Sequence, residues 1–208
     1  MIAIIDYGVG NLFSLRSSLR YLGFEAVVSG DAEVLRGADK LILPGVGAFG
    51  DAMDKLAAVG LIEPLRKLAA AGKPLLGICL GMQMLFSESL EFGRHEGLGL
   101  LPGRVEPMEA PLRALGLDYK IPQIGWNALH IVRPDCPLLR ECREGDYVYY
   151  VHSYYAVGCG DCLAAESDYG VIVPGVVWKD NVYGTQFHPE KSGEVGLGIL
   201  KAFCEVSL

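Results

Sequence analysis

The sequence predicts an α/β protein built on a doubly wound, mainly parallel sheet that is extended by antiparallel strands. Three patterns support this prediction. Short apolar runs alternate with amphipathic stretches over residues 1–86, which is typical of βαβ units. The first run, residues 1–6, is apolar at almost every position, as in a strand buried on both faces of a parallel sheet. From residue 105 onward, strand-like runs follow one another, which favours antiparallel pairing.

The first half of the chain alternates strands with helices. Leucines recur at helical spacing over residues 12–22, and Gly23 ends that helix. Asp51 is interpreted as the N-cap of a later helix. We expect strands at 1–6, 24–28, 40–43 and 73–79, and helices at 12–22, 31–38, 61–71 and 81–86.

The second half changes character after a polar, glycine-containing loop at 88–102, which holds Glu91. No linker or internal repeat separates the segments, so residues 1–208 are interpreted as a single domain. We expect strands at 126–132, 146–152, 163–167, 176–179 and 182–187, and a closing helix at 193–206.

Composition narrows the classes of function. The chain has 208 residues and a net charge of −7, and its basic residues are interspersed with acidic ones, which argues against nucleic-acid binding. The longest apolar stretches have the length of strands, so no membrane span is expected. The start of the chain has no basic region before its apolar run, so we expect no signal peptide, a cytoplasmic location and mostly reduced cysteines.

The main candidate for a nucleophile is Cys79, at the centre of Gly-Ile-Cys-Leu-Gly. Glycine on both sides suits a sharp strand-to-helix turn. Glycine tolerates unusual backbone angles, and because it has no Cβ it allows two backbone segments to approach closely. Such a turn lifts Cys79 out of the sheet and places it at a helix N-terminus, which favours the thiolate. A buried cysteine beside turn glycines would have the same pattern, so that alternative stays open at this point.

A thiolate nucleophile needs a base, and the base needs a group that orients it. His188 and Glu190 follow a late strand, and residues two apart can face the same way, so the carboxylate can hold the imidazole. His152, which ends another strand, is the second candidate base. A solvated histidine and glutamate after a strand would have the same pattern as His188 and Glu190.

Acyl transfer also needs donors for the developing oxyanion. The backbone N–H of Leu80, directly after the cysteine, can be one of them. The second can come from Val46 in the glycine-rich loop 45–47, which ends a neighbouring strand, although an ordinary turn explains this loop equally well.

The six cysteines include one closely spaced pair. Cys159 and Cys162 have the spacing of a zinc knuckle or a redox pair, and Cys136 and Cys142 could supply two further zinc ligands. The spacing of this second pair is loose for such a site. A loop that carries two thiols is therefore the favoured interpretation, with structural zinc as the alternative.

Six motifs occur in a characteristic order. They are Asp-Tyr-Gly-Val-Gly-Asn at 6–11, Pro-Gly-Val-Gly at 44–47, Gly-Ile-Cys-Leu-Gly-Met-Gln at 77–83, Ile-Gly-Trp-Asn at 124–127, Tyr-Tyr-Val-His-Ser-Tyr-Tyr at 149–155 and Gln-Phe-His-Pro-Glu-Lys-Ser at 186–192. Over essentially its whole length the chain resembles the class I (triad) glutamine amidotransferases, which have a flavodoxin-like sheet. Within them it is similar to the glutaminase subunits of imidazole glycerol phosphate synthase, in histidine biosynthesis.

This resemblance implies a role for each matching residue. It implies that Cys79 is the nucleophile, His188 the base and acid, and Glu190 the orienting group, and that glutamine is hydrolysed through a thioester without a cofactor or metal. The residues at matching positions that hold glutamine in the family are Gly47, Gln83, Glu91, Ser153 and Tyr154. Those at or near the family's subunit interface are Asn11, Trp126, Tyr149 and Lys191.

The resemblance also implies a partner, a (βα)8-barrel cyclase subunit that receives ammonia through an internal tunnel. The cyclase makes imidazole glycerol phosphate and an aminoimidazole carboxamide ribotide, and the glutaminase is nearly idle until the cyclase binds its ligand. The chain departs from the family at Gln123, where a histidine is common, and in the pair Cys159 and Cys162. The rival interpretations are a class I amidotransferase of another pathway, a free γ-glutamyl hydrolase and a non-catalytic flavodoxin-like regulator.

Overall fold

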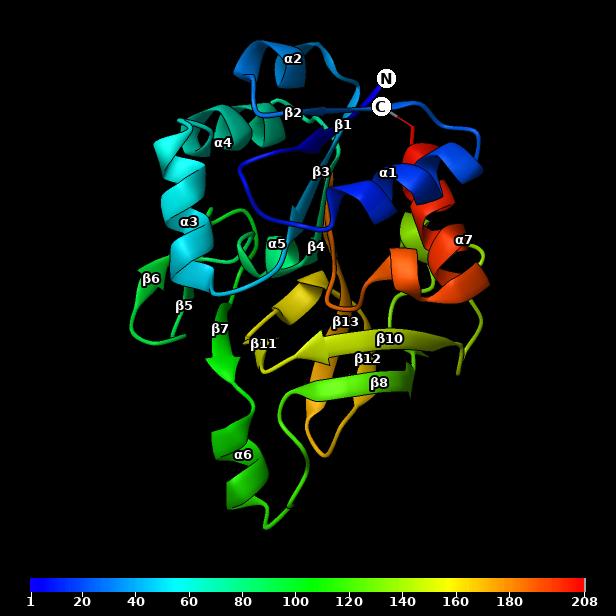
Figure 1. Ribbon diagram of the computed structural model, residues 1–208. Helices are drawn as coiled ribbons and strands as arrows, with labels where there is room; N and C mark the ends of the chain where they lie inside the picture. Colours follow the sequence, from blue (N-terminus) through cyan, green and yellow to red (C-terminus); the bar gives the residue numbers. More distant parts are fainter. Residues whose placement is uncertain (208) are drawn as a thin grey trace.

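The computed structural model of the chain, shown in Figure 1, describes residues 1–207. Its central sheet has eight strands. In chain order they are β1 Ile2–Ile5, β2 Ala26–Ser29, β3 Lys40–Gly45, β4 Leu75–Cys79, β9 His130–Ile131, β12 Leu163–Asp168, β13 Ile172–Lys179 and β14 Val182–Thr185. In space their order is β2-β1-β3-β4-β14-β13-β12-β9.

One part of this sheet is parallel and the other antiparallel. The strands from β2 to β14 pair in parallel, and the strands from β14 to β9 pair antiparallel. All residues of β1, β3, β4 and β14 are buried, as expected for apolar strands covered on both faces. The predicted α/β class, with antiparallel strands added to a parallel sheet, is confirmed.

Helices cover both faces of the parallel part, as Figure 1 shows. On one face lie α1 Leu12–Tyr21 and α7 Gly193–Cys204, and on the other lie α2 Ala32–Gly37, α3 Phe49–Ala58 and α4 Ile62–Ala70. A hydrophobic core lies on each face of the sheet, and alternate residues of β1 point into these two cores. Ile4 packs with α1 and α7, whereas Ile5 packs with the other three helices. None of the helices within residues 1–207 is long and apolar enough to cross a membrane.

Two smaller sheets extend the structure beside the carboxyl end of β4. One pairs β8 Gln123–Ala128 with β10 Tyr147–His152. The other joins β11 Tyr154–Val157, β7 Arg104–Pro107, β5 Glu88–Ser89 and β6 His95–Glu96. The remaining elements are α5 Leu80–Gln83, α6 Glu109–Ala114 and three 3₁₀ turns at Pro137–Leu139, Gly160–Cys162 and Pro189–Lys191.

The strand predicted at 126–132 is wrong, because this stretch is divided between two sheets. β8 ends at Ala128, and β9 then pairs with β12 of the central sheet. Between them, Leu129 donates its N–H to the Asp146 carbonyl and accepts from Gly145 N–H. Hydrogen bonds to the turn at residues 145–146 therefore hold Leu129, where the chain passes from one sheet to the other. No local sequence pattern indicates this break in the strand.

The prediction that Asp51 caps a helix is also wrong. α3 begins at Phe49, so Asp51 lies within its first turn, and the N-cap residue is Ala48. The free N–H of Phe49 donates instead to Glu91 Oε2 at 2.6 Å. A carboxylate distant in sequence thus satisfies the helix N-terminus, which prefers negative charge.

Candidate active site

Cys79 ends β4 in a strained backbone conformation. Its φ is 55° and its ψ is −112°, values that L residues rarely adopt, and α5 begins at the next residue. A Cβ on Gly81 would overlap the Leu43 carbonyl oxygen, and a Cβ on Gly77 would lie 2.6 Å from the Gly81 carbonyl oxygen. Both glycines are therefore needed for the close approach of β3, β4 and α5 that forms this turn.

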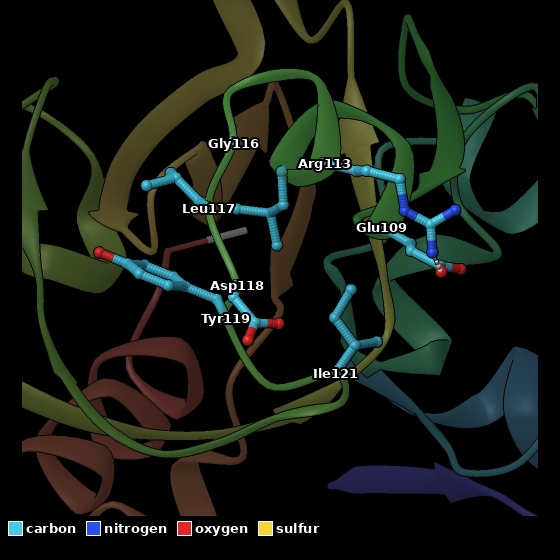
Figure 2. A pocket seen from close by; sticks show the side chains of 8 residues that line it. Glu109, Arg113, Gly116, Leu117, Asp118, Tyr119 and Ile121 are labelled. Carbon is cyan, nitrogen blue, oxygen red and sulfur yellow. Dashed lines mark hydrogen bonds and ion pairs between the residues drawn. The ribbon is translucent and has the colours of Figure 1, made fainter.

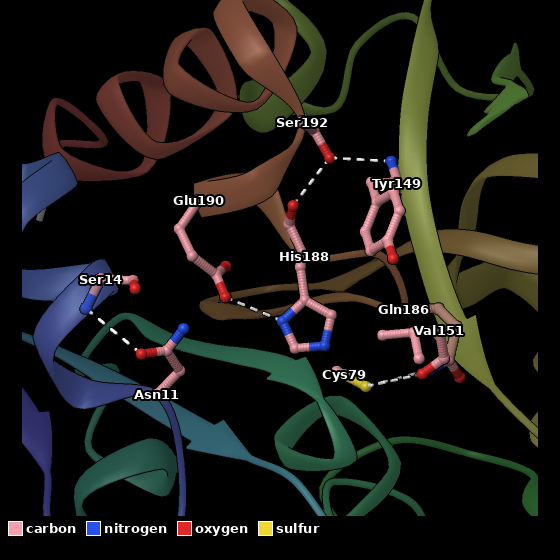
Figure 3. Close-up of polar contacts among 9 residues, drawn as sticks. All are labelled: Asn11, Ser14, Cys79, Tyr149, Val151, Gln186, His188, Glu190 and Ser192. Atoms are coloured by element: carbon pink, nitrogen blue, oxygen red, sulfur yellow. Dashed lines mark hydrogen bonds and ion pairs between the residues drawn. The ribbon is translucent and has the colours of Figure 1, made fainter. Parts of the chain in front are cut away.

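His188 and Glu190 reach the same place from the end of β14. His188 N–H donates to the Tyr149 carbonyl at 3.0 Å, and Ser192 Oγ donates to the His188 carbonyl at 2.7 Å. These bonds, with the 3₁₀ turn at Pro189–Lys191, fix the backbone after the strand. The His188 Nδ1 atom then lies 2.8 Å from Glu190 Oε1, and both side chains are buried. Figure 3 shows the Glu190 carboxylate directed at the His188 ring.

The imidazole of His188 favours the protonated form. Burial lowers its pKa, but hydrogen bonds and charge interactions with Cys79 and Glu190 outweigh burial and raise the pKa to about 9. The structure therefore brings Cys79, His188 and Glu190 together, with the His188 ring between the sulfur and the Glu190 carboxylate. Protonated His188 can give its proton to a leaving group, and the Glu190 carboxylate beside it stabilises its charge.

His152, the second candidate base, has a different environment. It is buried, its Nδ1 atom lies 2.9 Å from the Tyr154 carbonyl oxygen, and its Nε2 atom makes no hydrogen bond within residues 1–207. Burial lowers the pKa of His152 to about 4, although the Tyr154 carbonyl opposes this effect. The ring is neutral at physiological pH and has no carboxylate to orient it.

A cavity of about 570 Å³ opens over Cys79 and His188. Its lining includes both residues predicted to supply oxyanion donors, Val46 and Leu80. It also includes every residue predicted to hold glutamine, namely Gly47, Gln83, Glu91, Ser153 and Tyr154. The structure thus brings together side chains from distant parts of the chain around the cysteine.

Two residues on the rim of this cavity come from one loop. Glu91 is buried and holds the start of α3, and burial raises the pKa of its carboxyl group even though the Phe49 N–H opposes this. Phe92 has a φ of 53°, and its ring contacts Tyr154 edge-on at 6.2 Å between centroids. Sequence reasoning missed Phe92, because no pattern marks an exposed phenylalanine in a loop as part of a site.

The four residues predicted at a subunit interface lie around this end of the molecule. Trp126 on β8 is 52% exposed, and its ring contacts Tyr149 on β10 edge-on at 5.9 Å between centroids. Lys191 lines the cavity, and Asn11 Oδ1 accepts from Ser14 N–H at the start of α1 (Figure 3). Gln123 faces inward instead, fully buried, and donates to Asn127 Oδ1 at 2.9 Å.

Gln186 is a second residue that sequence reasoning missed. It is fully buried, and its Nε2 atom donates to Cys79 Sγ at 3.8 Å. The available signal was its position two residues before His188, on the same strand end.

The four cysteines of the zinc alternative are not assembled into one site. Cys159 and Cys162 pack into the core on one face of the central sheet, and Cys136 packs into the core on the other. Among the described residues, no cluster of three or more His, Cys, Asp or Glu side chains could hold a metal ion.

Another cavity, of about 560 Å³, lies beside α6 (Figure 2). Apolar side chains such as Leu117 and Ile121 line it, together with Asp118 and the ion pair between Glu109 and Arg113. Its lining contains no histidine or cysteine, so the nucleophilic chemistry lies in the cavity over Cys79.

Comparison with known proteins places the chain in a family. The sequence model of the family described as Glutamine amidotransferase class-I matches residues 3–205. The chain is 50% identical over 204 residues to imidazole glycerol phosphate synthase subunit HisH of Syntrophotalea carbinolica, covering 98% of each protein. It is 51% identical over 203 residues to the subunit of the same name from Bacillus cereus, covering 98% of this chain and 93% of the relative. The solved structure of PurLQS from Thermotoga maritima has the same fold, with a TM-score of 0.75, 22% identity and coverage of 98% and 96%.

Proposed function

This chain belongs to the class I glutamine amidotransferase family, and from that membership we propose that it is the glutaminase subunit of imidazole glycerol phosphate synthase. The observation that carries the chemistry is the line Cys79–His188–Glu190 at the wall of a cavity. A nucleophile, a base and an orienting carboxylate in this order are the groups that acyl transfer requires. Identity near 50% over almost the whole chain supports the assignment to this synthase rather than to another pathway.

The reaction proceeds in two steps. The Cys79 thiolate adds to the amide carbon of the glutamine side chain, and the carbonyl oxygen becomes an oxyanion. Protonated His188 gives its proton to the amide nitrogen, the C–N bond breaks, ammonia leaves and a thioester remains. Neutral His188 then takes a proton from water, which attacks the thioester, and the C–S bond breaks to release glutamate.

The other residues hold the reacting groups in place. Glu190 keeps the His188 ring in the orientation that points its Nε2 atom toward Cys79, and its charge stabilises the imidazolium. The backbone N–H groups of Leu80 and Val46 stabilise the oxyanion. The side of the cavity formed by Gln83, Glu91 and Tyr154 holds the substrate glutamine.

Ammonia released inside the protein must reach a second active site, because the synthase makes an imidazole ring. We assign this site to a (βα)8-barrel cyclase subunit, which forms a heterodimer with this chain in the cytoplasm. Exposed Trp126 and half-buried Tyr149 offer an aromatic surface for it, and Asn11 and Lys191 lie near the cavity mouth. One amidotransferase domain, residues 1–208, carries the glutaminase part of the reaction.

Iodoacetamide labelling tests whether the thiol is activated. Cys79 should react fastest of the six cysteines, and glutamine should slow its labelling. Cys142 is a matched control, because it is more exposed than Cys79, yet burial raises the pKa of its thiol to about 12. Uniformly slow labelling that ignores glutamine would support the rival interpretation of a non-catalytic regulator.

A further inference from the structure

A line of hydrogen bonds runs from the wall of the cavity to the sulfur of Cys79. Gln83 Nε2 donates to the Tyr154 carbonyl oxygen at 2.9 Å and to Gln186 Oε1 at 3.0 Å. Gln186 Nε2 then donates to Cys79 Sγ at 3.8 Å, within reach for a sulfur acceptor. Both glutamine side chains are buried, and Gln186 is seen beside the sulfur in Figure 3.

The chemistry of the Tyr154 carbonyl fixes the direction of this line. A carbonyl oxygen can only accept, so the NH₂ end of Gln83 must face it. The same NH₂ group faces Gln186, which must therefore present its oxygen to Gln83. The NH₂ end of Gln186 is left pointing at the sulfur. The hydrogen-bond network therefore fixes the orientation of the Gln186 amide, and an N–H donor faces Cys79.

The sulfur consequently has different partners for its two protonation states. As a thiol it can donate to the Val151 carbonyl oxygen, which lies 3.9 Å away. As a thiolate it is an acceptor only, and the Gln186 N–H and the protonated His188 both serve that form. Gln186 is fully buried, so water cannot replace its N–H group as a donor to the sulfur. Loss of this donor should therefore disfavour the thiolate form of Cys79.

We propose that Gln186 is an additional catalytic residue, whose side-chain N–H stabilises the Cys79 thiolate and holds its sulfur at the cavity wall. The proposal rests on the assignment of Cys79 as the nucleophile. It gives Gln83 a role besides any contact with substrate, because Gln83 fixes which end of Gln186 meets the sulfur.

The pH profile of Cys79 alkylation tests the proposal directly. Iodoacetamide labelling would be followed by mass spectrometry of the Cys79 peptide in the wild type and in Gln186→Met, which removes the donor and keeps the length of the side chain. We expect the midpoint of the profile to rise by about one pH unit, since a hydrogen bond to a charged group is worth about that much. The plateau rate at high pH should rise about threefold, because a less stabilised thiolate is a stronger nucleophile.

The titratable groups around Cys79 are the same in both proteins. They are Tyr7 after β1, His188 and Glu190 after β14, His152 on β10, and Glu91, Tyr154 and Lys191 in the cavity lining. The midpoint belongs to the coupled Cys79–His188 pair, and the substitution adds no charge near that pair. Gln123→Met is the matched control, because it makes the same substitution at another fully buried glutamine, and its profile should equal the wild type.

An unchanged profile in Gln186→Met would overturn the proposal, and so would an equal shift in Gln123→Met. A lower plateau rate without a shift would indicate that Gln186 only packs against the cysteine, and would also overturn it. If Gln186→Met does not fold, Gln186→Leu is judged by the same midpoint, because it also removes the donor and adds no charge beside the sulfur. Glutaminase activity that survives Cys79→Ala would instead contradict the proposed function, whatever the alkylation profiles show.

Discussion

Gly45 lies directly opposite Cys79 in the parallel pairing of β3 with β4. A Cβ on Gly45 would stand 2.7 Å from the backbone nitrogen of Gly81 and 3.0 Å from the Tyr7 hydroxyl oxygen. The same hydroxyl donates to the Pro44 carbonyl at 2.8 Å. The end of β3, which precedes Val46, is thus packed directly against the turn that carries Cys79. The positions of both proposed oxyanion donors, the N–H groups of Val46 and Leu80, depend on this contact.

Gly45→Ala should therefore impair both stability and activity. Overpacking against backbone atoms typically costs about 1–3 kcal/mol, and displacement of one oxyanion donor costs roughly a hundredfold in rate. Urea unfolding and glutamate release would measure the two effects. Gly37→Ala is the control, because a Cβ there meets none of the atoms of residues 1–207 within 4 Å. Activity within threefold of wild type in Gly45→Ala would contradict this account.

Glu190→Gln should slow glutamine hydrolysis by about 10²- to 10⁴-fold, because an amide cannot stabilise the imidazolium and can select the wrong tautomer of His188. The effect should appear in kcat rather than in KM. Glu194→Gln, an exposed change one turn later in α7, is the matched control. A loss smaller than tenfold would mean that Glu190 does not orient the base.

His152 should make the protein sensitive to acid. Its pKa is near 6.5 when unfolded and about 4 when folded, so the unfolded chain binds more protons between these values. The stability from neutral His152 is fully present above pH 6.5 and is lost as the pH falls toward 4, by about 2 kcal/mol between pH 7 and pH 5.

The measurement is urea unfolding at both pH values in the wild type and in His152→Gln, which cannot titrate. The raised pKa of His188 makes its contribution to the free energy of unfolding change with pH in the opposite direction. Both proteins retain His188, so this contribution cancels in the comparison. The wild type should lose about 2 kcal/mol more than the variant. Equal losses would show that His152 titrates normally in the folded protein.

Trp126→Ala should weaken binding of the cyclase partner by about 2 kcal/mol, or roughly thirtyfold in Kd, because exposed tryptophans dominate many interfaces. Saturating partner should restore the stimulated rate of hydrolysis. Tyr21→Ala, which removes an 80%-exposed aromatic ring at the far end of α1, is the control. Calorimetric titration that found equal affinities for wild type and Trp126→Ala would remove Trp126 from the interface.

Sequence patterns were sufficient to predict the elements whose conformation depends on residues close to them in the chain. The apolar run of β1 and the glycines around Cys79 predict their conformations, because burial on both faces and a sharp turn each demand particular residue types. The helix at 12–22 and the closing helix were also found, to within a few residues.

The misses share a physical cause, which is dependence on distant contacts. Asp51 has the local character of a cap, but Glu91 binds the start of α3 from another loop. The break at Leu129 depends on a turn at 145–146, and Gln186 becomes part of the site through contacts with Cys79 and Gln83. The helix α6 and the strand β11 were not predicted, because each is short and weakly patterned.

The central claim is that Cys79 hydrolyses glutamine and that a cyclase partner controls the rate. Glutamate release should be measured for the wild type and for Cys79→Ala, each alone and with the barrel cyclase supplied with its nucleotide ligand. We predict slow turnover by the isolated wild type, a many-fold increase with the liganded partner, and no turnover in Cys79→Ala under either condition. A wild-type rate that the liganded partner does not change, or turnover that persists without Cys79, would contradict the account.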